Sequence, residues 1–453
     1  MRAVLEMQKS RKYRRRLRLI PLAAATYFMV AGGPYGIEDI LGGAGYAKAL
    51  LILLLLPLVW SFPTALMIGE LASALPEEGG FYVWVRRAMG PFWGYQEAWL
   101  SLSASIFDMA IYPTLFLLYL NRLFPAWTVG WRGTTWELAL ILACCLWNLR
   151  GAPAVGDGSM AMFVLLLTPF AVLVVAAIWH GMHLHGNPAW SAGAAGNEGL
   201  STAILVGLWN YMGWDNASTV AQEVENPQRN YPRAMLLSTT IVALSYAIPL
   251  AAIAYAGLDI SRFTTGSWAD AASLLAGPWL GAAIVLGGTI TGIGMFNALM
   301  MSYARLPMVL AEDGMLPSFL ASRNRYGVPW AAVLLCAMAW GLALQFSFER
   351  LISIDLMLYG ASLILEFIAL VVLRLREPNL ERPFRAGSLA TAIALGVIPT
   401  LLIVYAAFVS RNERMANMPA LLFGLIVAAA GPVFYGLSRT MRARKPAEEA
   451  EQL

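Results

Sequence analysis

Two short stretches of sequence decide the expected fold. Residues 31–36 read Ala-Gly-Gly-Pro-Tyr-Gly in the middle of one apolar segment, and residues 209–215 read Trp-Asn-Tyr-Met-Gly-Trp-Asp in the middle of another. A helix can unwind at such places, because glycine tolerates unusual backbone angles and proline has no N–H to donate. In the hydrocarbon of a bilayer, unwound backbone survives only where it lines a cavity of the protein. Each stretch therefore predicts a broken helix beside a cavity.

The composition around these stretches is that of a protein in a lipid bilayer. Of the 453 residues, 59% are hydrophobic and only 13% are charged, about half the roughly 25% typical of soluble domains. This excludes a disulfide-bonded secreted scaffold and a disordered regulator. The net charge of +4 is too small to indicate a nucleic-acid partner. The cysteines have no metal-ligand spacing and are expected to be packing residues, namely Cys144, Cys145 and Cys336.

Twelve apolar segments are near the ~20 residues that a spanning helix needs. They lie near residues 19–41, 49–75, 92–121, 134–150, 159–180, 200–222, 234–257, 274–303, 329–347, 351–375, 389–409 and 417–437. Both termini are expected in the cytoplasm, because 24 of the 31 Lys and Arg residues then fall on that side, as the positive-inside rule requires. We therefore expect a multi-pass protein of the cytoplasmic membrane.

The two interrupted segments occupy matching places in the chain. Residues 19–180 and 200–375 each hold five segments, and each half begins with an interrupted one. Such matching indicates an inverted-repeat secondary transporter with its substrate site near the bilayer midplane. The alternative is that Gly-Gly-Pro is a mere packing kink. The expected parts are a basic segment at 1–18, a core at 19–375, two further helices at 389–437 and a tail at 438–453.

Carboxylates inside the apolar segments are candidate functional groups. They are Glu38, Asp39, Glu70, Glu97, Asp108, Asp215, Asp355 and Glu366. No Lys or Arg lies deep in a segment, so these acids are expected to be protonated, hydrated or awaiting a cationic ligand. Function is favoured for Asp108 and Asp215. Glu70 and Glu97 lie near segment ends and can reach the interface instead, and Asp355 is expected to face an outer vestibule.

Polar residues form one helical face on each of two segments. The first face holds Glu97, Ser101, Ser105, Asp108 and Tyr112, and the second holds Asp355, Tyr359, Ser362 and Glu366. Steps of three and four residues place such side chains in line on an α-helix. The two faces indicate a shared hydrated route. For the serines, the favoured alternative is hydrogen bonding between helices.

Histidines are absent from the apolar interior, since all three lie in or beside one expected outer loop, as His180, His183 and His185. Proton coupling would therefore fall to a buried carboxylate. The candidates are Asp215, Asp108 and Glu366. No metal or cofactor is expected.

Two tryptophans flank the second interruption, Trp209 and Trp214. An indole face attracts an ammonium group with ~1–2 kcal/mol when both are removed from water. Trp209 is the candidate for a gate that stacks on the substrate and closes over it.

Several motifs resemble those of a known family. The stretch from Gly32 to Asp39 is similar to the helix 1 signature of the polyamine-uptake branch of the amino acid–polyamine–organocation (APC) superfamily. Residues 62–70, 76–84 and 108–113 resemble the same branch. Residues 213–218 and 223–227 resemble the superfamily's helix 6 signature, and residues 312–317 and 382–384 resemble its later cytoplasmic motifs.

The resemblance implies an all-α integral membrane protein of twelve transmembrane helices. It further implies a LeuT-like fold of five-plus-five inverted repeats, with helices 1 and 6 unwound at mid-membrane and holding the substrate. In related arginine exchangers a Trp at the position of Trp209 caps the substrate, and an acid at that of Asp215 is linked to pH sensing.

The first interruption departs from many amino-acid carriers of this superfamily. Those carriers place a Gly-Ser-Gly-type turn there, whose N–H groups hold the substrate carboxylate. Here Pro34 has no N–H to offer, and Glu38 adds negative charge. Both features favour a substrate with ammonium groups and without a carboxylate.

The expected function is import of an amine-bearing metabolite, with putrescine- or spermidine-like polyamines favoured, by proton-coupled alternating access. The alternative is an amino-acid permease or exchanger. A channel and a membrane enzyme have no supporting motif. Expected substrate-binding residues are Gly32, Gly33, Pro34, Tyr35, Gly36, Glu38, Asp108, Tyr112, Trp209, Asn210, Gly213, Trp214 and Asp215.

Sodium coupling stays open at this point. Hydroxyl groups near the first interruption could contribute to a sodium site, at Thr289, Thr291 and Ser302. The number of membrane acids favours protons.

Overall fold

Helices make up nearly all of the described chain. The computed structural model describes residues 16–183, 189–190, 199–260, 263–345, 348–412, 414–415 and 418–451. The first half contains α2 (Leu19–Val30), α3 (Glu38–Leu56), η1 (Pro57–Ser61), α4 (Phe62–Ala74), α5 (Phe81–Met89), α6 (Pro91–Leu123), α7 (Pro125–Thr128), α8 (Trp131–Asn148) and α9 (Ala152–His183).

The second half of the chain is also helical. It contains α10 (Leu200–Asn210), η2 (Trp214–Glu223), α11 (Pro227–Tyr255), α12 (Trp268–Ala276), α13 (Pro278–Tyr303), α14 (Arg305–Glu312), η3 (Ser318–Ala321), α15 (Trp330–Ala343) and α16 (Phe348–Arg376). The last part contains α17 (Leu389–Val409), η4 (Ser410–Asn412), the two-residue strands β1 (Arg414–Met415) and β2 (Met418–Pro419), and α18 (Ala420–Glu451). The two strands pair with each other in antiparallel fashion.

Eight stretches of the described residues are long and apolar enough to cross a membrane. They are Glu38–Ala74, Pro91–Leu123, Ala152–His183, Pro227–Tyr255, Pro278–Glu312, Ile354–Arg376, Leu389–Val409 and Ala420–Arg439. Shorter or less apolar helices occupy the other four predicted segments, namely α2, α8, α10 and α15. The chain is therefore an all-helical, multi-pass membrane protein, and the number twelve stays a prediction.

The first predicted interruption is present. Helix α2 ends at Val30, and α3 begins only at Glu38. Two glycines in the gap have positive φ angles, 79° at Gly33 and 86° at Gly36, which L side chains rarely adopt. The Glu38 carboxylate accepts a hydrogen bond from the Gly36 N–H at 2.7 Å, so an acid at the start of α3 stabilises the unwound backbone.

The second predicted interruption is present as well. Helix α10 ends at Asn210, and the chain resumes at Trp214 as η2, a 3₁₀ helix rather than the α-helix expected to residue 222. Gly213 between them has φ 92°. A Cβ atom there would lie 2.3 Å from the Met29 carbonyl oxygen near the end of α2. Only glycine therefore lets the two interruptions approach each other this closely.

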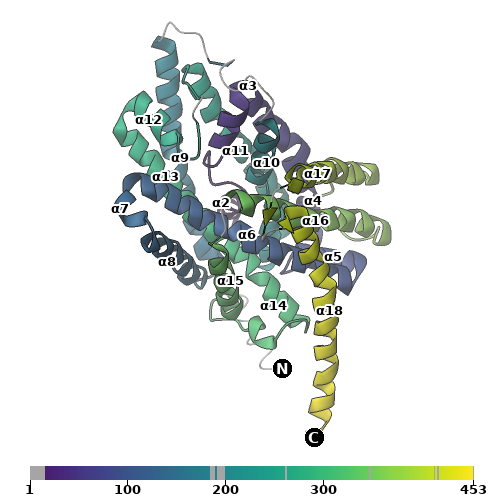
Figure 1. Cartoon of the computed structure of the whole chain (residues 1–453). Helices are drawn as coiled ribbons and strands as arrows, with labels where there is room; N and C mark the ends of the chain where they lie inside the picture. Colours follow the sequence, from purple (N-terminus) through teal and green to yellow (C-terminus); the bar gives the residue numbers. More distant parts are fainter. Residues whose placement is uncertain are drawn as a thin grey trace.

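A long central helix, α6, organises the bundle around these breaks. It packs against α13 and α16, and α13 in turn packs against α9 and α2. In Figure 1 α6 crosses the middle of the molecule, α17 lies at its right-hand edge, and α18 extends downward to the C-terminus. The breaks and the polar face of α6 thus meet in the interior.

Replacing Gly213 by alanine is expected to destabilise the protein by about 2–4 kcal/mol, because the added methyl group combines an unfavourable φ with a clash against backbone. Gly436 in α18 provides the control, since it is an exposed helical residue without a positive φ and a Cβ atom there would meet no neighbouring atom within 4 Å. Gly436→Ala should therefore not lower the stability, because alanine favours the helix more than glycine does. Thermal unfolding of both purified variants measures the difference, and equal shifts would contradict the close approach.

Candidate functional site

A small cavity lies between the two helix breaks. Its lining comes from α2, α6, the second break, the end of α13 and α16, and consists of Met29, Val30, Asp108, Tyr112, Trp209, Met212, Gly213, Tyr303 and Tyr359. Its volume of about 10 Å³ is room for roughly one water molecule. The structure therefore holds this site in a closed state, and a larger ligand requires the lining to move apart.

Asp108 is the acidic group of this cavity. Its carboxylate accepts a hydrogen bond from the Tyr112 hydroxyl at 2.5 Å and lies 3.4 Å from the Tyr303 hydroxyl. The Trp209 side chain lines the same cavity. Three aromatic side chains from three different elements therefore surround one carboxylate.

Asp215 does not line the cavity but contacts it through a tyrosine. The Tyr359 hydroxyl donates to the Asp215 carboxylate at 2.5 Å. The same hydroxyl accepts a hydrogen bond from the Gly213 N–H at 3.0 Å. Tyr359 thus connects α16 to the second break and separates Asp215 from the space beside Asp108.

Trp214 does not line the cavity and is fully buried. Its indole N–H donates to the Tyr211 carbonyl at 2.8 Å, as a packing tryptophan would. Asn210 also lies outside the cavity lining. Its side-chain amide donates to the carbonyls of Val206 at 2.9 Å and Gly36 at 3.4 Å, so it ties the second break to the first.

The residues of the first break mostly bond to the surrounding protein. The Gly32 carbonyl accepts from Thr291 at 2.5 Å, and the Pro34 carbonyl accepts from the Trp268 indole at 2.6 Å. The Tyr35 hydroxyl donates to the Ile284 carbonyl at 2.5 Å. Of the expected substrate-binding residues, the structure brings Asp108, Tyr112, Trp209 and Gly213 to the cavity and leaves residues 32–36 outside its lining.

Glu38 is fully buried and saturated by protein donors. Besides the Gly36 N–H, it accepts from the Tyr119 hydroxyl at 2.7 Å and from the Gly266 N–H at 3.0 Å. It therefore joins the first break to α6 and to the segment that leads into α12. This arrangement differs from a carboxylate that waits for an ammonium group.

Glu38→Gln should lower the free energy of unfolding by about 1–3 kcal/mol, because the amide nitrogen replaces one carboxylate oxygen and cannot accept the backbone hydrogen bond made there, from Gly36 at Oε2 or from Gly266 at Oε1. Asp39 is the neighbouring control. It accepts from the Thr265 N–H at 3.2 Å and hydroxyl at 3.0 Å and is partly exposed. A larger thermal shift for Asp39→Asn than for Glu38→Gln would refute this assignment.

Two expectations about the acids are wrong. Glu70 was expected to lack a cationic partner, but Arg374 and Arg382 both form ion pairs with it, because distant parts of the chain bring two guanidinium groups to the end of α4. Asp355 was expected to face a vestibule but is only 1% exposed. It lies on α16, which packs against α6.

Two tyrosines of the cavity, Tyr303 and Tyr359, were not among the expected binding residues. Tyr359 stood on the predicted polar face of residues 355–366, which could have identified it. Tyr303 is the last residue of α13, and nothing in the local sequence distinguishes it from a packing residue.

The three hydroxyls considered for a sodium site are not brought together. Thr291 donates to the Gly32 carbonyl, Thr289 donates to the Leu286 carbonyl at 2.7 Å, and Ser302 donates to the Asn216 amide oxygen at 2.7 Å. Each hydroxyl has its own protein acceptor. Sodium coupling therefore gains no support from these residues.

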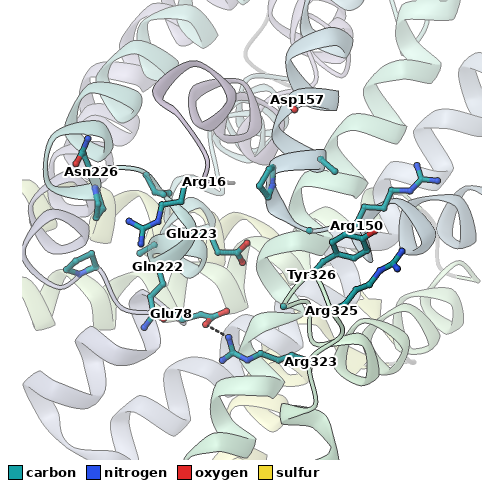
Figure 2. A pocket seen from close by; sticks show the side chains of 18 of the residues that line it. Arg16, Glu78, Arg150, Asp157, Gln222, Glu223, Asn226, Arg323, Arg325 and Tyr326 are labelled. Carbon is teal, nitrogen blue, oxygen red and sulfur yellow. Dashed lines mark hydrogen bonds and ion pairs between the residues drawn. The ribbon is translucent and has the colours of Figure 1, made fainter. Parts of the chain in front are cut away.

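A second, larger pocket opens at the far end of η2, with a volume of about 860 Å³. Residues from five segments of the chain line it, from Arg16 and from the stretches 76–78, 150–157, 221–228 and 323–327. Figure 2 shows Glu78 paired with Arg323, and Glu223 above this pair in the view. The pocket lies beside the N-terminal segment, since Arg16 belongs to its lining.

Ion pairs close the deep end of this pocket. Arg305 is only 2% exposed and pairs with Glu223 and with Glu78, the latter at 3.6 Å. Burial raises the pKa of the Glu78 carboxyl above its ordinary value, although the positive charges of Arg305 and Arg323 act in the opposite direction. Leu17 also pairs with Val224 in a parallel bridge. The N-terminal segment and η2 are thus joined here, and η2 links this closed end to the central cavity.

Comparison with known proteins shows which family and which relatives this chain is similar to in sequence. A family model described as amino acid permease matches residues 24–430. Polyamine transporter PUT1 of Oryza sativa subsp. japonica is 36% identical over 92% of this chain and 78% of its own length. Polyamine transporter RMV1 of Arabidopsis thaliana is 33% identical over 91% of this chain and 84% of its own length. The serine/threonine exchanger SteT of Bacillus subtilis is 24% identical over 88% of this chain and 91% of its own length.

Proposed function

The chain belongs to the amino acid permease family of the APC superfamily, and we propose that it imports polyamines such as putrescine or spermidine across the cytoplasmic membrane. Transport proceeds by alternating access of one central site to the two sides. The proposed fold is the LeuT-like one, with twelve spans, two inverted five-helix repeats and both breaks at mid-membrane. Both termini lie in the cytoplasm.

The observation that carries this proposal is the set of three aromatic side chains around the Asp108 carboxylate. A carboxylate supplies the opposite charge for an ammonium group, and the faces of Tyr112, Trp209 and Tyr303 add cation–π attraction. Among the described residues that line the cavity, none is positively charged. A cationic amine therefore suits this lining better than an anion does.

The first helix break supports a substrate without a carboxylate. Pro34 has no N–H, and the Gly36 N–H already donates to Glu38 at 2.7 Å. A substrate carboxylate would have to displace that acid. The names of the two plant relatives, both polyamine transporters, agree with this chemistry.

In the proposed cycle, one ammonium group of the substrate replaces the hydroxyl groups at Asp108, and Trp209 closes over it. A buried acid takes up a proton on the outside and releases it inside, with Asp108, Asp215 and Glu366 as the coupling candidates. The membrane potential adds inward drive of about 2.3 kcal/mol per elementary charge per 100 mV. A polycation therefore gains more than a zwitterion from the same potential.

Uptake into vesicles reconstituted with the purified protein tests this function. Labelled putrescine should accumulate, unlabelled spermidine should compete with it, and leucine and serine should not. Vesicles without protein are the control.

The alternative is an amino-acid permease or exchanger, which the name of the exchanger SteT favours. If serine- or leucine-like zwitterions are taken up and putrescine is not, this alternative replaces the polyamine proposal.

A further inference from the structure

Asp355 of α16 is a buried carboxylate that the proposed transport cycle does not use. It is only 1% exposed, and neither of its oxygens has a hydrogen-bond partner among the described residues. Arg122, near the end of the neighbouring helix α6, pairs with Asp270 instead, at 2.9 Å. A buried carboxylate without a donor or a counter-charge is costly. In a membrane protein such a group is a candidate for contact with a ligand.

The neighbours of α16 show which way Asp355 faces. Gly360 packs against α17, and Met357 lies against α18. Tyr359 is on another side of the helix, where it lines the central cavity. Asp355 is four residues before Tyr359 and therefore shares its face, roughly opposite the side that meets α17 and α18. Asp355 thus faces the interior of the bundle, one turn away from a residue of the cavity.

The helices α6 and α16 run in opposite directions. Arg376, the last residue of α16, donates a hydrogen bond at 3.0 Å to a backbone carbonyl at the end of α5, just before α6 begins. Further along, Tyr359 of α16 and Asp108 of α6 line the same cavity. One turn before Tyr359 is therefore level with one turn after Asp108. Asp355 consequently lies at the end of the cavity that Tyr112 forms.

The carboxylates of Asp108 and Asp355 are thus offset by about one helical turn, roughly 5 Å. Asp108 is bonded to the Tyr112 hydroxyl at 2.5 Å, whereas Asp355 has no described donor. Asp355 interacts electrostatically with Asp108 and with Tyr112, which agrees with this placement. A chain of a few methylene groups spans a comparable length, so one short molecule can reach both acids.

The closed cavity of about 10 Å³ must grow before it holds any amine. Growth toward Asp355 exposes a carboxylate that loses no hydrogen bond to the described protein. The other acids near the breaks would lose bonds, because Asp215 accepts from Tyr359 and Glu38 accepts from three donors. Asp355 is therefore the acid that a ligand at Asp108 reaches at the lowest cost.

We infer that Asp355 binds the second ammonium group of a linear diamine or polyamine whose first ammonium group is bound at Asp108. The inference rests on the proposed function and names the feature of the substrate that the site selects. A monoamine leaves Asp355 without a counter-charge, and the carboxylate of an amino acid meets a like charge there. Two separated carboxylates therefore favour a substrate with two separated positive charges.

Two amines with the same carbon chain test this role. Putrescine has an ammonium group at each end, and n-butylamine has one at a single end. The wild type should bind putrescine at least about 30-fold more tightly, because n-butylamine lacks one desolvated charge pair. Asp355→Asn should weaken putrescine binding by a similar factor and should not weaken n-butylamine binding. Isothermal titration calorimetry of the purified full-length protein measures both dissociation constants.

Further variants separate this role from a general effect on the site. Asp108→Asn should weaken the binding of both amines. Asp355→Glu keeps the charge and should keep part of the preference for putrescine, whereas Asp355→Ser should lose it as the asparagine variant does. Glu137→Gln is the matched control, since Glu137 is a buried glutamate of α8, 7% exposed and outside the cavity lining. It should bind both amines as the wild type does.

Equal weakening of both amines by Asp355→Asn and Asp355→Ser would overturn the inference, and so would unchanged putrescine binding in either variant. With wild-type uptake of putrescine intact, these results remove only the role of Asp355 and leave the proposed function in place. If the wild type neither binds nor takes up putrescine, the proposed function fails first, and the inference fails with it.

Discussion

Replacing Asp108 by asparagine is expected to reduce putrescine uptake by about 100-fold, because removing one member of a desolvated charge pair costs about 2–5 kcal/mol. Asparagine has nearly the same shape and can still accept a hydrogen bond from the Tyr112 hydroxyl, which lies 2.5 Å from the carboxylate. The fold should therefore be retained while the attraction for the ammonium group is lost. Initial uptake rates, at equal amounts of reconstituted protein, measure the effect.

Two further variants test whether the loss of uptake is caused by the missing charge at position 108. Glu381 is an exposed acid before α17, and Glu381→Gln should transport at the wild-type rate. Asp108→Glu keeps the charge but moves it by one methylene group, so uptake should fall less than in the asparagine variant. Wild-type uptake by Asp108→Asn would exclude this carboxylate as the amine-binding group.

Arg374→Met is expected to produce the largest loss of stability, about 3–5 kcal/mol, because it leaves a buried carboxylate without its main partner. Arg374 donates to Oε1 of Glu70 at 2.8 Å and also to Oε2. It also donates to the carbonyls of Gly387 at 3.0 Å and Ala386 at 3.1 Å. One side chain therefore connects α4, α16 and the segment before α17. Thermal and denaturant unfolding in detergent measure the loss.

An exposed ion pair supplies the comparison. Arg87 and Glu377 pair at 2.7 Å, but their side chains remain 39% and 32% exposed. Arg87→Met should therefore cost no more than about 1 kcal/mol. The double variant Glu70→Gln/Arg374→Met should recover part of the stability lost by Arg374→Met, since it removes the stranded charge. Equal costs for Arg374→Met and Arg87→Met would contradict the structural role of the buried pair.

The helix breaks could be predicted from sequence because their causes are local. Glycine and proline act on their own backbone, so residues 31–36 and 209–215 predicted the interruptions without any knowledge of the surrounding helices. The polar faces of α6 and α16 were predictable for the same reason, since helical periodicity places Asp108 and Tyr359 on them. The apolar composition likewise predicted an all-helical membrane protein.

Tertiary pairing could not be predicted in this way. Glu70 and Arg374 are 304 residues apart, so the sequence offered no sign that this acid is neutralised. Glu38 looked like a group awaiting a cation because its three donors come from the first break, α6 and the segment before α12. Trp268 of α12 reaches the Pro34 carbonyl from 234 residues away. Such contacts depend on how helices pack, which periodicity does not encode.

Some residues of the aromatic cavity could likewise be predicted from the sequence, and others could not. Trp209 and Asp108 were identified from their places beside a break and on a polar face. Tyr303 belongs to neither class, and only the packing of α13 against α6 brings its hydroxyl to 3.4 Å from Asp108. An apolar helix can thus bring a cavity-lining residue to its end without a local signal in the sequence.

A structure determined by electron cryomicroscopy with saturating putrescine tests the central claim most directly. One amine of the ligand should lie within hydrogen-bonding distance, about 2.7–3.2 Å, of the Asp108 carboxylate, with the Trp209 ring against its alkyl chain. The cavity should be enlarged relative to its present volume of about 10 Å³. Ligand density elsewhere in the protein, with the space beside Asp108 still closed, would contradict the proposed binding site.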